Sequence, residues 1–304
     1  MTIVPPAPGE PRRPSGPRDP GDAWVVGPTG ERYWGRFGAA GLLALDPQRG
    51  VLLQHRVSWS HHGDTWGLPG GARHEGESAV DGAIREAQEE AGVPDAATRP
   101  RLLSVLDLDY WTYTTLVADV IHPFEPTISD PESRELAWVP VDDVDDRPLH
   151  PGFAQSWQRL RAVLPVRPAI VVDGANVVGS VPDGWWRDRA GSAQRLIERV
   201  GGVAERGIAA GELGLPEDLW FPEWSVVVEG AAKAVASTTP GVEIVRAEAS
   251  GDDAIVAEAR RLVDLGRTVT VVTSDRELAA RVTEGGAAVR GTRWLLDLLQ
   301  PSTG

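Results

Sequence analysis

The stretch that most constrains this chain runs from Gly71 to Val93 and joins a fixed spacing to a high density of glutamate. Gly71 is followed after five residues by Glu77, and seven further residues lead to the acidic run 85–90. Good helix formers and the absence of proline predict a helix over residues 78–91, which Gly92 is placed to end. Small and apolar residues at helical spacing give it a narrow stripe that can pack against a sheet: Ala79, Ala83, Ile84, Ala87 and Ala91.

Three glutamates crowd one flank of this predicted helix. Glu86, Glu89 and Glu90 are neighbours because residues three and four apart on a helix adjoin each other, and each exposed like-charge pair costs a few tenths of a kcal/mol. A divalent cation reverses that repulsion, and Mg²⁺ often binds one or two carboxylates together with phosphate oxygens and water. The stretch therefore predicts hydrolysis of a phosphoanhydride with Mg²⁺ (or Mn²⁺) as cofactor. A solvated acidic helix is the alternative.

The complete spacing resembles the Nudix box, the motif of hydrolases that cleave a nucleoside diphosphate linked to another group. Every defined position is filled, although Ala87 stands where the family usually has a larger apolar residue. The resemblance implies that Glu86, Glu89 and Glu90 hold the metal and activate water, and that the carbonyl of Gly71 is a further metal ligand. It also implies that Arg85, which completes the expected catalytic set, pairs with Glu77 and holds the loop against the helix.

Residues outside the box supply candidates for substrate contacts. Trp66 could stack on a base, or it could be a structural ring packed beneath the rim of the site. Glu132 and Glu135 could contact substrate, complete the metal site or act as the base, but solvated loop glutamates need no such role. His61 and His62 make a weak metal site, since no third nitrogen or sulfur ligand is obviously spaced with them.

The length of 304 residues favours two domains. Residues 1–22 are rich in proline, glycine and charge, and this composition predicts a disordered tail. The resemblance covers about residues 35–165, so we expect a Nudix domain over 23–165 with an α/β/α sandwich and a mixed sheet. Proline residues at 165 and 168 mark the boundary to a second domain over 166–304.

The second domain alternates strand and helix signals, which predicts a doubly wound α/β/α fold with a mainly parallel sheet. Apolar runs end in or just before Asp173, Glu229 and Asp275, while Asp252 and Asp253 open a predicted helix. The carboxyl ends of strands face one crevice in such sheets. Carboxylates gathered there repel one another unless a cation binds, which is an arrangement used by two-metal nucleases. Capping of helices is the simpler explanation for such aspartates.

The order of these acids resembles the NYN branch of the PIN-like ribonucleases, in the segments Asp-Gly-x-Asn, Gly-Asp-Asp and Thr-Ser-Asp-x-Glu-Leu. The resemblance implies a metal site of Asp173, Asp252, Asp253 and Asp275, with Asn176 contacting substrate. Glu229 stands where relatives often have aspartate, which leaves its role open. Residues 185–189 carry two tryptophans and two arginines that could clamp single-stranded RNA, or could plug the sheet and start a helix.

Composition excludes several classes of protein. The net charge of −14, from 30 basic and 44 acidic residues, is unsuited to strong non-specific binding of nucleic acid. The absence of cysteine excludes disulfides and thiolate metal sites. No stretch is apolar enough to span a membrane, and the N-terminal residues lack the apolar core of a signal peptide. We therefore expect a cytoplasmic protein with no membrane partner.

These observations predict a Mg²⁺-dependent hydrolase whose partner is a nucleotide, either a nucleoside triphosphate or a nucleoside diphosphate derivative. One alternative is an RNA 5′-end processing enzyme in which the second domain cuts the chain. Another is a nucleotide-sensing or docking protein with an idle second domain. Nudix relatives often dimerise, so the resemblance also leaves a homodimer open.

Overall fold

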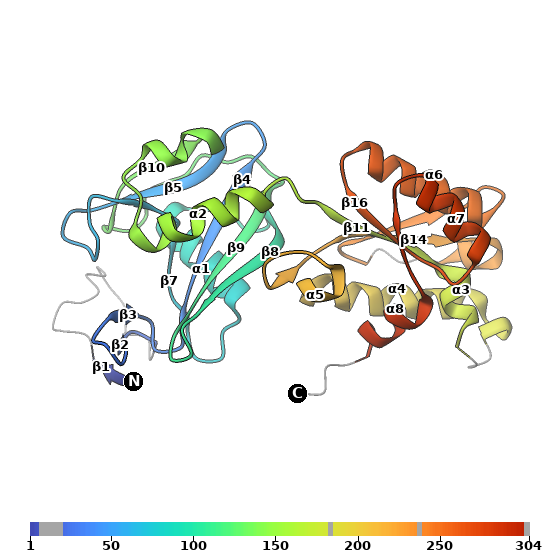
Figure 1. Ribbon diagram of the computed structural model, residues 1–304, viewed down its shortest axis with the longest axis horizontal. Coiled ribbons are helices and arrows are strands. Elements are labelled where there is room, and N and C mark those ends of the chain that lie inside the picture. Colours follow the sequence, from blue (N-terminus) through green and yellow to red (C-terminus); the bar gives the residue numbers. More distant parts are fainter. Residues whose placement is uncertain (6–20, 182–184, 236–238, 301–304) are drawn as a thin grey trace. The chain divides into compact units, whose positions relative to one another are not determined.

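The computed structural model describes residues 1–5, 21–181, 185–235 and 239–300. The chain separates into two compact units (Figure 1). The first comprises Met1–Leu164 with Pro216–Asp218, and the second comprises Pro165–Leu215 with Leu219–Gly304. Within the described residues, no helix has the length and apolar character needed to cross a membrane.

A mixed sheet forms the centre of the first unit, in the order β10-β5-β4-β9-β8. Strands β4 and β9 run parallel and the other neighbours run antiparallel. Two short strands extend it, because β6 pairs with β5 and β7 pairs with β4. The strands are β4 (Ala39–Asp46), β5 (Gly50–Arg56), β6 (Trp66–Gly67), β7 (Gly70–Ala72), β8 (Thr98–Asp107), β9 (Thr112–Val120) and β10 (Ser133–Val139).

Helix α1 (Ala79–Ala91) covers this sheet through its alanine stripe. Ala83, Ala87 and Ala91 are fully buried in a cluster with small and branched side chains of β4 and β9. The hydroxyl of Ser78 accepts a hydrogen bond from Asp81 N and caps the helix start, while Gly92 ends it in the left-handed conformation (φ 62°). The small residue at position 87 therefore lies directly against the sheet.

The N-terminal residues contain a strand where the sequence predicted a disordered tail over residues 1–22. Residues 6–20 lie outside the described part of the chain, but β1 (Thr2–Val4) pairs with β2 (Trp24–Val26), which pairs with β3 (Arg32–Trp34). Ordered structure thus begins before residue 22, because residues 2–4 are β-branched and strand-forming. A 3₁₀ helix η1 (Val141–Asp146) and helix α2 (Pro151–Val163) follow β10.

The second unit has a parallel sheet in the order β15-β14-β11-β16-β17. Its strands are β11 (Pro168–Asp173), β14 (Glu223–Val228), β15 (Val242–Arg246), β16 (Thr268–Val272) and β17 (Ala288–Arg290). The short strands β12 (Ile208–Ala209) and β13 (Leu219–Trp220) pair with each other. The main helices are α3 (Gly174–Gly179), α4 (Arg189–Arg206), α6 (Gly251–Asp264), α7 (Arg276–Glu284) and α8 (Thr292–Leu298), with short turns η2 (Trp185–Arg187), α5 (Ala210–Leu213) and η3 (Gly230–Ala234).

Helices cover both faces of this parallel sheet. On β11, Ile170 and Val172 join the core cluster formed with α3, α4 and α8, whereas Ala169 and Val171 join the cluster formed with α6 and α7. The alternation follows from the two-residue period of a strand. The layers agree with the doubly wound fold expected from the sequence. The strand order reverses beside β11, and in such sheets ligands bind at the carboxyl ends of the strands at this point.

Candidate active site

Arg85 joins the loop before α1 to the helix itself. Its Nε and Nη2 donate hydrogen bonds of 2.8 and 3.0 Å to the two carboxylate oxygens of Glu77, and Nη2 also donates to the carbonyl of Ala72 at 2.9 Å. Its Nη1 lies 2.8 Å from Glu86 Oε1. Although burial opposes ionisation, the bonds from Arg85 and from His74 N hold the pKa of Glu77 below its ordinary value. The ion pair that the resemblance implied is therefore present.

Glu86 is buried against the backbone of Gly71. A Cβ atom added at Gly71 would lie 2.7 Å from both the carboxyl carbon and Oε2 of Glu86, closer than real Cβ contacts come. The next glycine towards the N-terminus, Gly70, is equally restricted, since its Cβ would lie 2.5 Å from the carbonyl oxygen of Ala40. The two glycines therefore let β7 pass between β4 and the glutamate of α1.

Glu90 lies deeper in the same corner, with 8% of its surface exposed. Its Oε2 accepts a hydrogen bond of 2.9 Å from Gly70 N. Burial, followed by the charge of Glu86, raises the pKa of Glu90 to about 8, while Arg56 lowers it. Two adjacent buried carboxylates repel each other, and a divalent cation with oxygen ligands would relieve that repulsion. The donor set is therefore suited to Mg²⁺ or Mn²⁺.

Glu89 is the exposed member of the trio. Nη1 of Arg85 lies 3.5 Å from its carboxylate, whose side chain is 48% exposed. The structure thus brings Gly71, Glu86 and Glu90 together and leaves Glu89 at the rim. Such an accessible carboxylate faces the solvent from which a substrate would arrive.

Of the candidate substrate residues outside the box, Glu132 lies near the box, whereas Glu135 and Trp66 lie beside His55. Glu132 lies near the box, because Arg56 is 3.6 Å from it and also acts on the pKa of Glu90. Glu135 lies 4.0 Å from His55 Nδ1 and has an exposed side chain. Trp66 is buried, and the centroid of its ring lies 4.7 Å from that of the stacked His55 ring. This packing agrees with the alternative that Trp66 is a structural ring. Sequence reasoning missed Arg56, for which no spacing signal exists.

The second unit gathers acidic residues in one cavity at the carboxyl edge of its sheet. The cavity has a volume of about 150 Å³. Asp173 Oδ1 accepts from Asn176 N at 3.0 Å and its Oδ2 accepts from Thr273 Oγ1 at 2.9 Å. Burial, then the neighbouring carboxylates, raise the pKa of Asp173, and the pKa of Asp252 is raised in the same way. The lining residues include Asp173, Asn176, Glu229, Asp252 and Asp275.

Two details of this cavity differ from the sequence prediction. Asp253 does not line it, since its carboxylate lies 2.6 Å from Arg281 Nη2 on α7. Glu229, whose role was open, does line it, and its Oε2 accepts from Gly251 N at 3.0 Å.

Asp275 caps α7, because its Oδ1 accepts hydrogen bonds from the backbone N–H groups of Glu277 and Leu278. Trp186, one of the residues considered for RNA, is 58% exposed.

Comparison with known proteins gives matches that cover about half of the chain. The family model of the NUDIX domain matches residues 35–160. A Mycobacterium tuberculosis protein named "Putative 8-oxo-dGTP diphosphatase 3" is 51% identical over 154 residues, which cover 47% of this chain and 70% of the relative. A Bifidobacterium longum protein named "Nucleoside triphosphate pyrophosphatase/Nudix hydrolase fusion protein" is 42% identical over 158 residues, 48% of this chain and 32% of that protein.

Among solved structures, a crystal structure described as a Nudix hydrolase from M. smegmatis, RenU, is 48% identical to this chain. The similarity covers 47% of this chain and 94% of that chain, with a TM-score of 0.43.

Proposed function

This chain belongs to the Nudix family of hydrolases, which act on acid anhydrides, and from that premise we propose that residues 23–165 are its catalytic Nudix domain. Its substrate would be a nucleoside triphosphate or a nucleoside diphosphate derivative. The observation that carries the proposal is the corner in which Arg85 fixes Glu77 and Glu86 while Gly71 admits the Glu86 carboxylate.

Mg²⁺, or Mn²⁺ in its place, would be held by Glu86, Glu89, Glu90 and the carbonyl of Gly71. When bound, the ion polarises phosphoryl oxygens and activates water. The chain's own residues fix the geometry, because the guanidinium of Arg85 orients Glu86 and the amide of Gly70 orients Glu90. The exposed carboxylate of Glu89, held by a contact of 3.5 Å with Arg85, would turn towards the metal ion when it binds.

The first substrate to test is 8-oxo-dGTP, since the Mycobacterium tuberculosis relative carries that substrate in its name. A screen for release of nucleoside monophosphate should compare it with the four common deoxynucleoside triphosphates and with ADP-ribose as a diphosphate derivative. We expect Mg²⁺-dependent release from at least one of them and loss of that release in Glu89→Gln. Equal rates in the variant and in the wild type would contradict the assignment.

For the second unit we propose a PIN-like domain over residues 166–304 with a metal-dependent ribonuclease site. The supporting observation is the cavity that collects Asp173, Asp252 and Asp275 beside the point where the strand order reverses. Fold alone does not establish activity. Labelled single-stranded RNA, capped and uncapped, incubated with the full chain and Mn²⁺ is the test. Internal cleavage supports a nuclease, and no cleavage leaves the alternative of an idle sensing or docking domain.

A further inference from the structure

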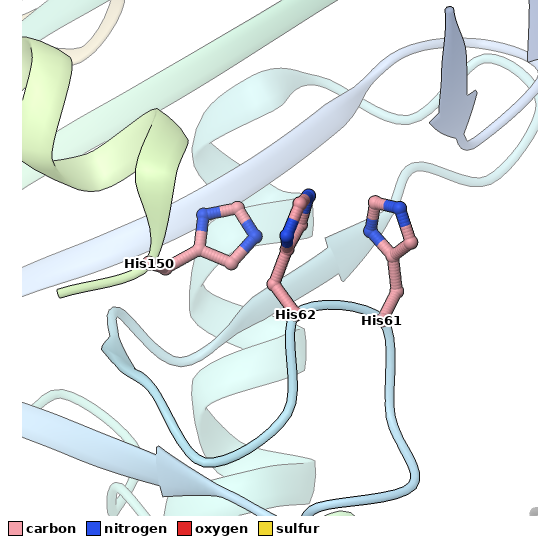
Figure 2. Close-up of side chains that lie close together, drawn as sticks. All are labelled: His61, His62 and His150. Atoms are coloured by element: carbon pink, nitrogen blue, oxygen red, sulfur yellow. The ribbon is translucent and has the colours of Figure 1, made fainter. Parts of the chain in front are cut away.

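Three histidines from two distant parts of the chain meet outside the glutamate corner. His61 and His62 follow β5, and His150 immediately precedes α2. One ligand nitrogen of each lies within 4.8 Å of those of the other two. The ring of His62 lies between the other two rings, which each turn a nitrogen towards it (Figure 2). Sequence spacing pointed to the first two residues and gave no sign of the third.

Backbone hydrogen bonds hold these residues together. Trp66 N donates to the carbonyl of Pro148 at 2.8 Å, and His150 N donates to the carbonyl of Trp66 at 2.7 Å. The loop before Trp66 folds back on β5, because Arg56 N donates to the carbonyl of Thr65 at 2.9 Å. His150 is thereby placed beside a loop far from it in the sequence. The juxtaposition is built by the sheet and does not depend on flexible side chains alone.

His62 adopts an uncommon backbone conformation, with φ 55°. Non-glycine residues in the left-handed region are rare, and such a conformation costs energy that the surrounding structure must supply. Here it sets the His62 ring between its two partners, with ring centroids 4.1 Å from His61 and 4.9 Å from His150. Gly63 makes the turn possible, since a Cβ there would lie 2.4 Å from the carbonyl oxygen of Val57.

We propose that His61, His62 and His150 form a binding site for a divalent transition-metal ion such as Zn²⁺, separate in ligand chemistry from the carboxylate corner. Three imidazoles suit zinc, copper and nickel, whereas carboxylate and carbonyl oxygens suit magnesium and manganese. A site with three protein ligands leaves a fourth position open for water or another ligand. The ion would link the loop after β5 to the start of α2.

The imidazoles of His61 and His150 are in the neutral form that binds metal at neutral pH. Partial burial, followed by the charges of Arg56 and the two other histidines, lowers the pKa of His150 to about 4. The side chain of His61 is exposed but partly desolvated, and this desolvation, with the charges of His62, Arg56 and Arg32, lowers its pKa. The two arginines disfavour a bound cation. The proposal therefore requires that coordination to three nitrogens outweigh the repulsion from these arginines, which solvent partly screens.

Binding requires two local adjustments. Zn–N distances of about 2.0–2.1 Å place tetrahedral ligand nitrogens about 3.4 Å apart, so the rings must close from their present limit of 4.8 Å. His61 and His62 are exposed and have room to rotate. His150 Nδ1 now accepts a hydrogen bond from Gly152 N at 3.2 Å. Ligation through Nε2 moves the ring proton to Nδ1 and breaks that bond, whose net contribution to stability is small.

The test is Zn²⁺ binding to the full chain without a polyhistidine tag, in millimolar Mg²⁺ to occupy the carboxylates. Competition with a chromophoric chelator measures affinity, and Co²⁺ absorption reports coordination by nitrogen. We expect one Zn²⁺ per chain and a rise in the thermal unfolding midpoint that increases with Zn²⁺ concentration. No binding above that of a chelator blank would overturn the proposal.

Four variants make the assignment specific. His62→Asn keeps a residue tolerant of the left-handed conformation, and His150→Asn keeps a good helix cap. Each should weaken Zn²⁺ binding at least about tenfold. The control is His122→Asn, an exposed histidine outside the cluster, which should bind as the wild type does. Unchanged affinity in the first two variants, or equal loss in the control, contradicts the site. Loss in Glu86→Gln alone would assign the ion to the carboxylates instead.

Discussion

Arg85 donates to both carboxylate oxygens of Glu77, at 2.8 and 3.0 Å, and so ties the residue that precedes the N-cap of α1 to the helix itself. Because the same guanidinium lies 2.8 Å from Glu86, the position of this proposed metal ligand depends on Glu77, which lies earlier in the chain. The pair is a positioning device, and its loss should alter the metal site before it unfolds the domain.

Glu77→Gln tests this device. The amide keeps the volume of the side chain but loses the charge that fixes Arg85. We expect kcat/KM to fall about 10- to 100-fold, the usual effect of mutating a residue that orients a metal ligand. The Mg²⁺ concentration for half-maximal activity should rise in the same variant, an effect that a purely structural role would not produce. A variant with lower stability but an unchanged Mg²⁺ requirement would contradict the positioning role.

Gly71→Ala tests the contact with Glu86. The added methyl would lie 2.7 Å from the Glu86 carboxylate and must displace it, so we expect kcat/KM to fall about 100-fold, as when a reacting group moves by about 1 Å. Gly67→Ala is the matched control, because its Cβ would meet its nearest neighbour, His150 Cβ, at an ordinary 3.5 Å. Equal activities of the two variants would show that Glu86 does not need its present position.

Asp173→Asn tests the cavity of the second unit. The variant removes a charge that faces Asp252 and Glu229, so any Mn²⁺-dependent RNA cleavage by the wild type should fall by at least about 100-fold. Asp264→Asn is the control, on the exposed end of α6 outside the cavity lining. Cleavage that persists in Asp173→Asn would assign the activity to another site or to a contaminant.

The acid stability of the second unit should depend on Glu258. The hydrogen bond from Arg261, with a further one from Ser225, lowers the pKa of this carboxyl despite its burial. A carboxylate with a lowered folded-state pKa stabilises the fold above its unfolded pKa of about 4.5, and this stabilisation disappears as the pH falls through the folded value. Glu258→Gln should therefore cost about 1–2 kcal/mol at pH 7 and progressively less at lower pH.

Denaturant unfolding of wild type and Glu258→Gln across the acid range measures this effect. The control is Glu284→Gln at the exposed end of α7, which should shift stability little at any pH. A difference between Glu258→Gln and the wild type that grows as the pH falls would contradict the sign of the shift.

The sequence predicts the helix of the box almost to the residue, since capping by Ser78 and Gly92 and the alanine stripe are local features. The three central strands of the parallel sheet, β14, β11 and β16, are predicted for the same reason, as mostly buried apolar runs that end next to acidic residues. The short edge strand β17 was not predicted. Local patterns do not give the pairing of β4 with β9, which are joined in parallel across α1 and β8. Strand β1 was missed because proline, glycine and charged residues dominate the sequence that follows it.

Contacts between distant residues account for the rest of the site. Arg56 carries no motif, yet it lies beside Glu132 and acts on Glu90. Asp253 fits the sequence pattern of a metal ligand, but Arg281 on the next helix draws it out of the cavity. His150 joins His61 and His62 only because Trp66 bonds to the chain before α2. Each of these depends on tertiary packing and not on sequence spacing.

The central claim is that exposed Glu89 acts with its two buried neighbours in Mg²⁺-dependent hydrolysis. The most direct measurement is a Mg²⁺ titration of nucleotide hydrolysis for the wild type, Glu89→Gln and the control Glu75→Gln. Glu75 is an exposed glutamate between Gly71 and Glu77, outside the proposed metal ligands. Glu89→Gln should lower turnover about 1000-fold, roughly 4 kcal/mol of barrier, while Glu75→Gln stays near the wild type. Hydrolysis that survives in Glu89→Gln at every Mg²⁺ concentration would contradict the account.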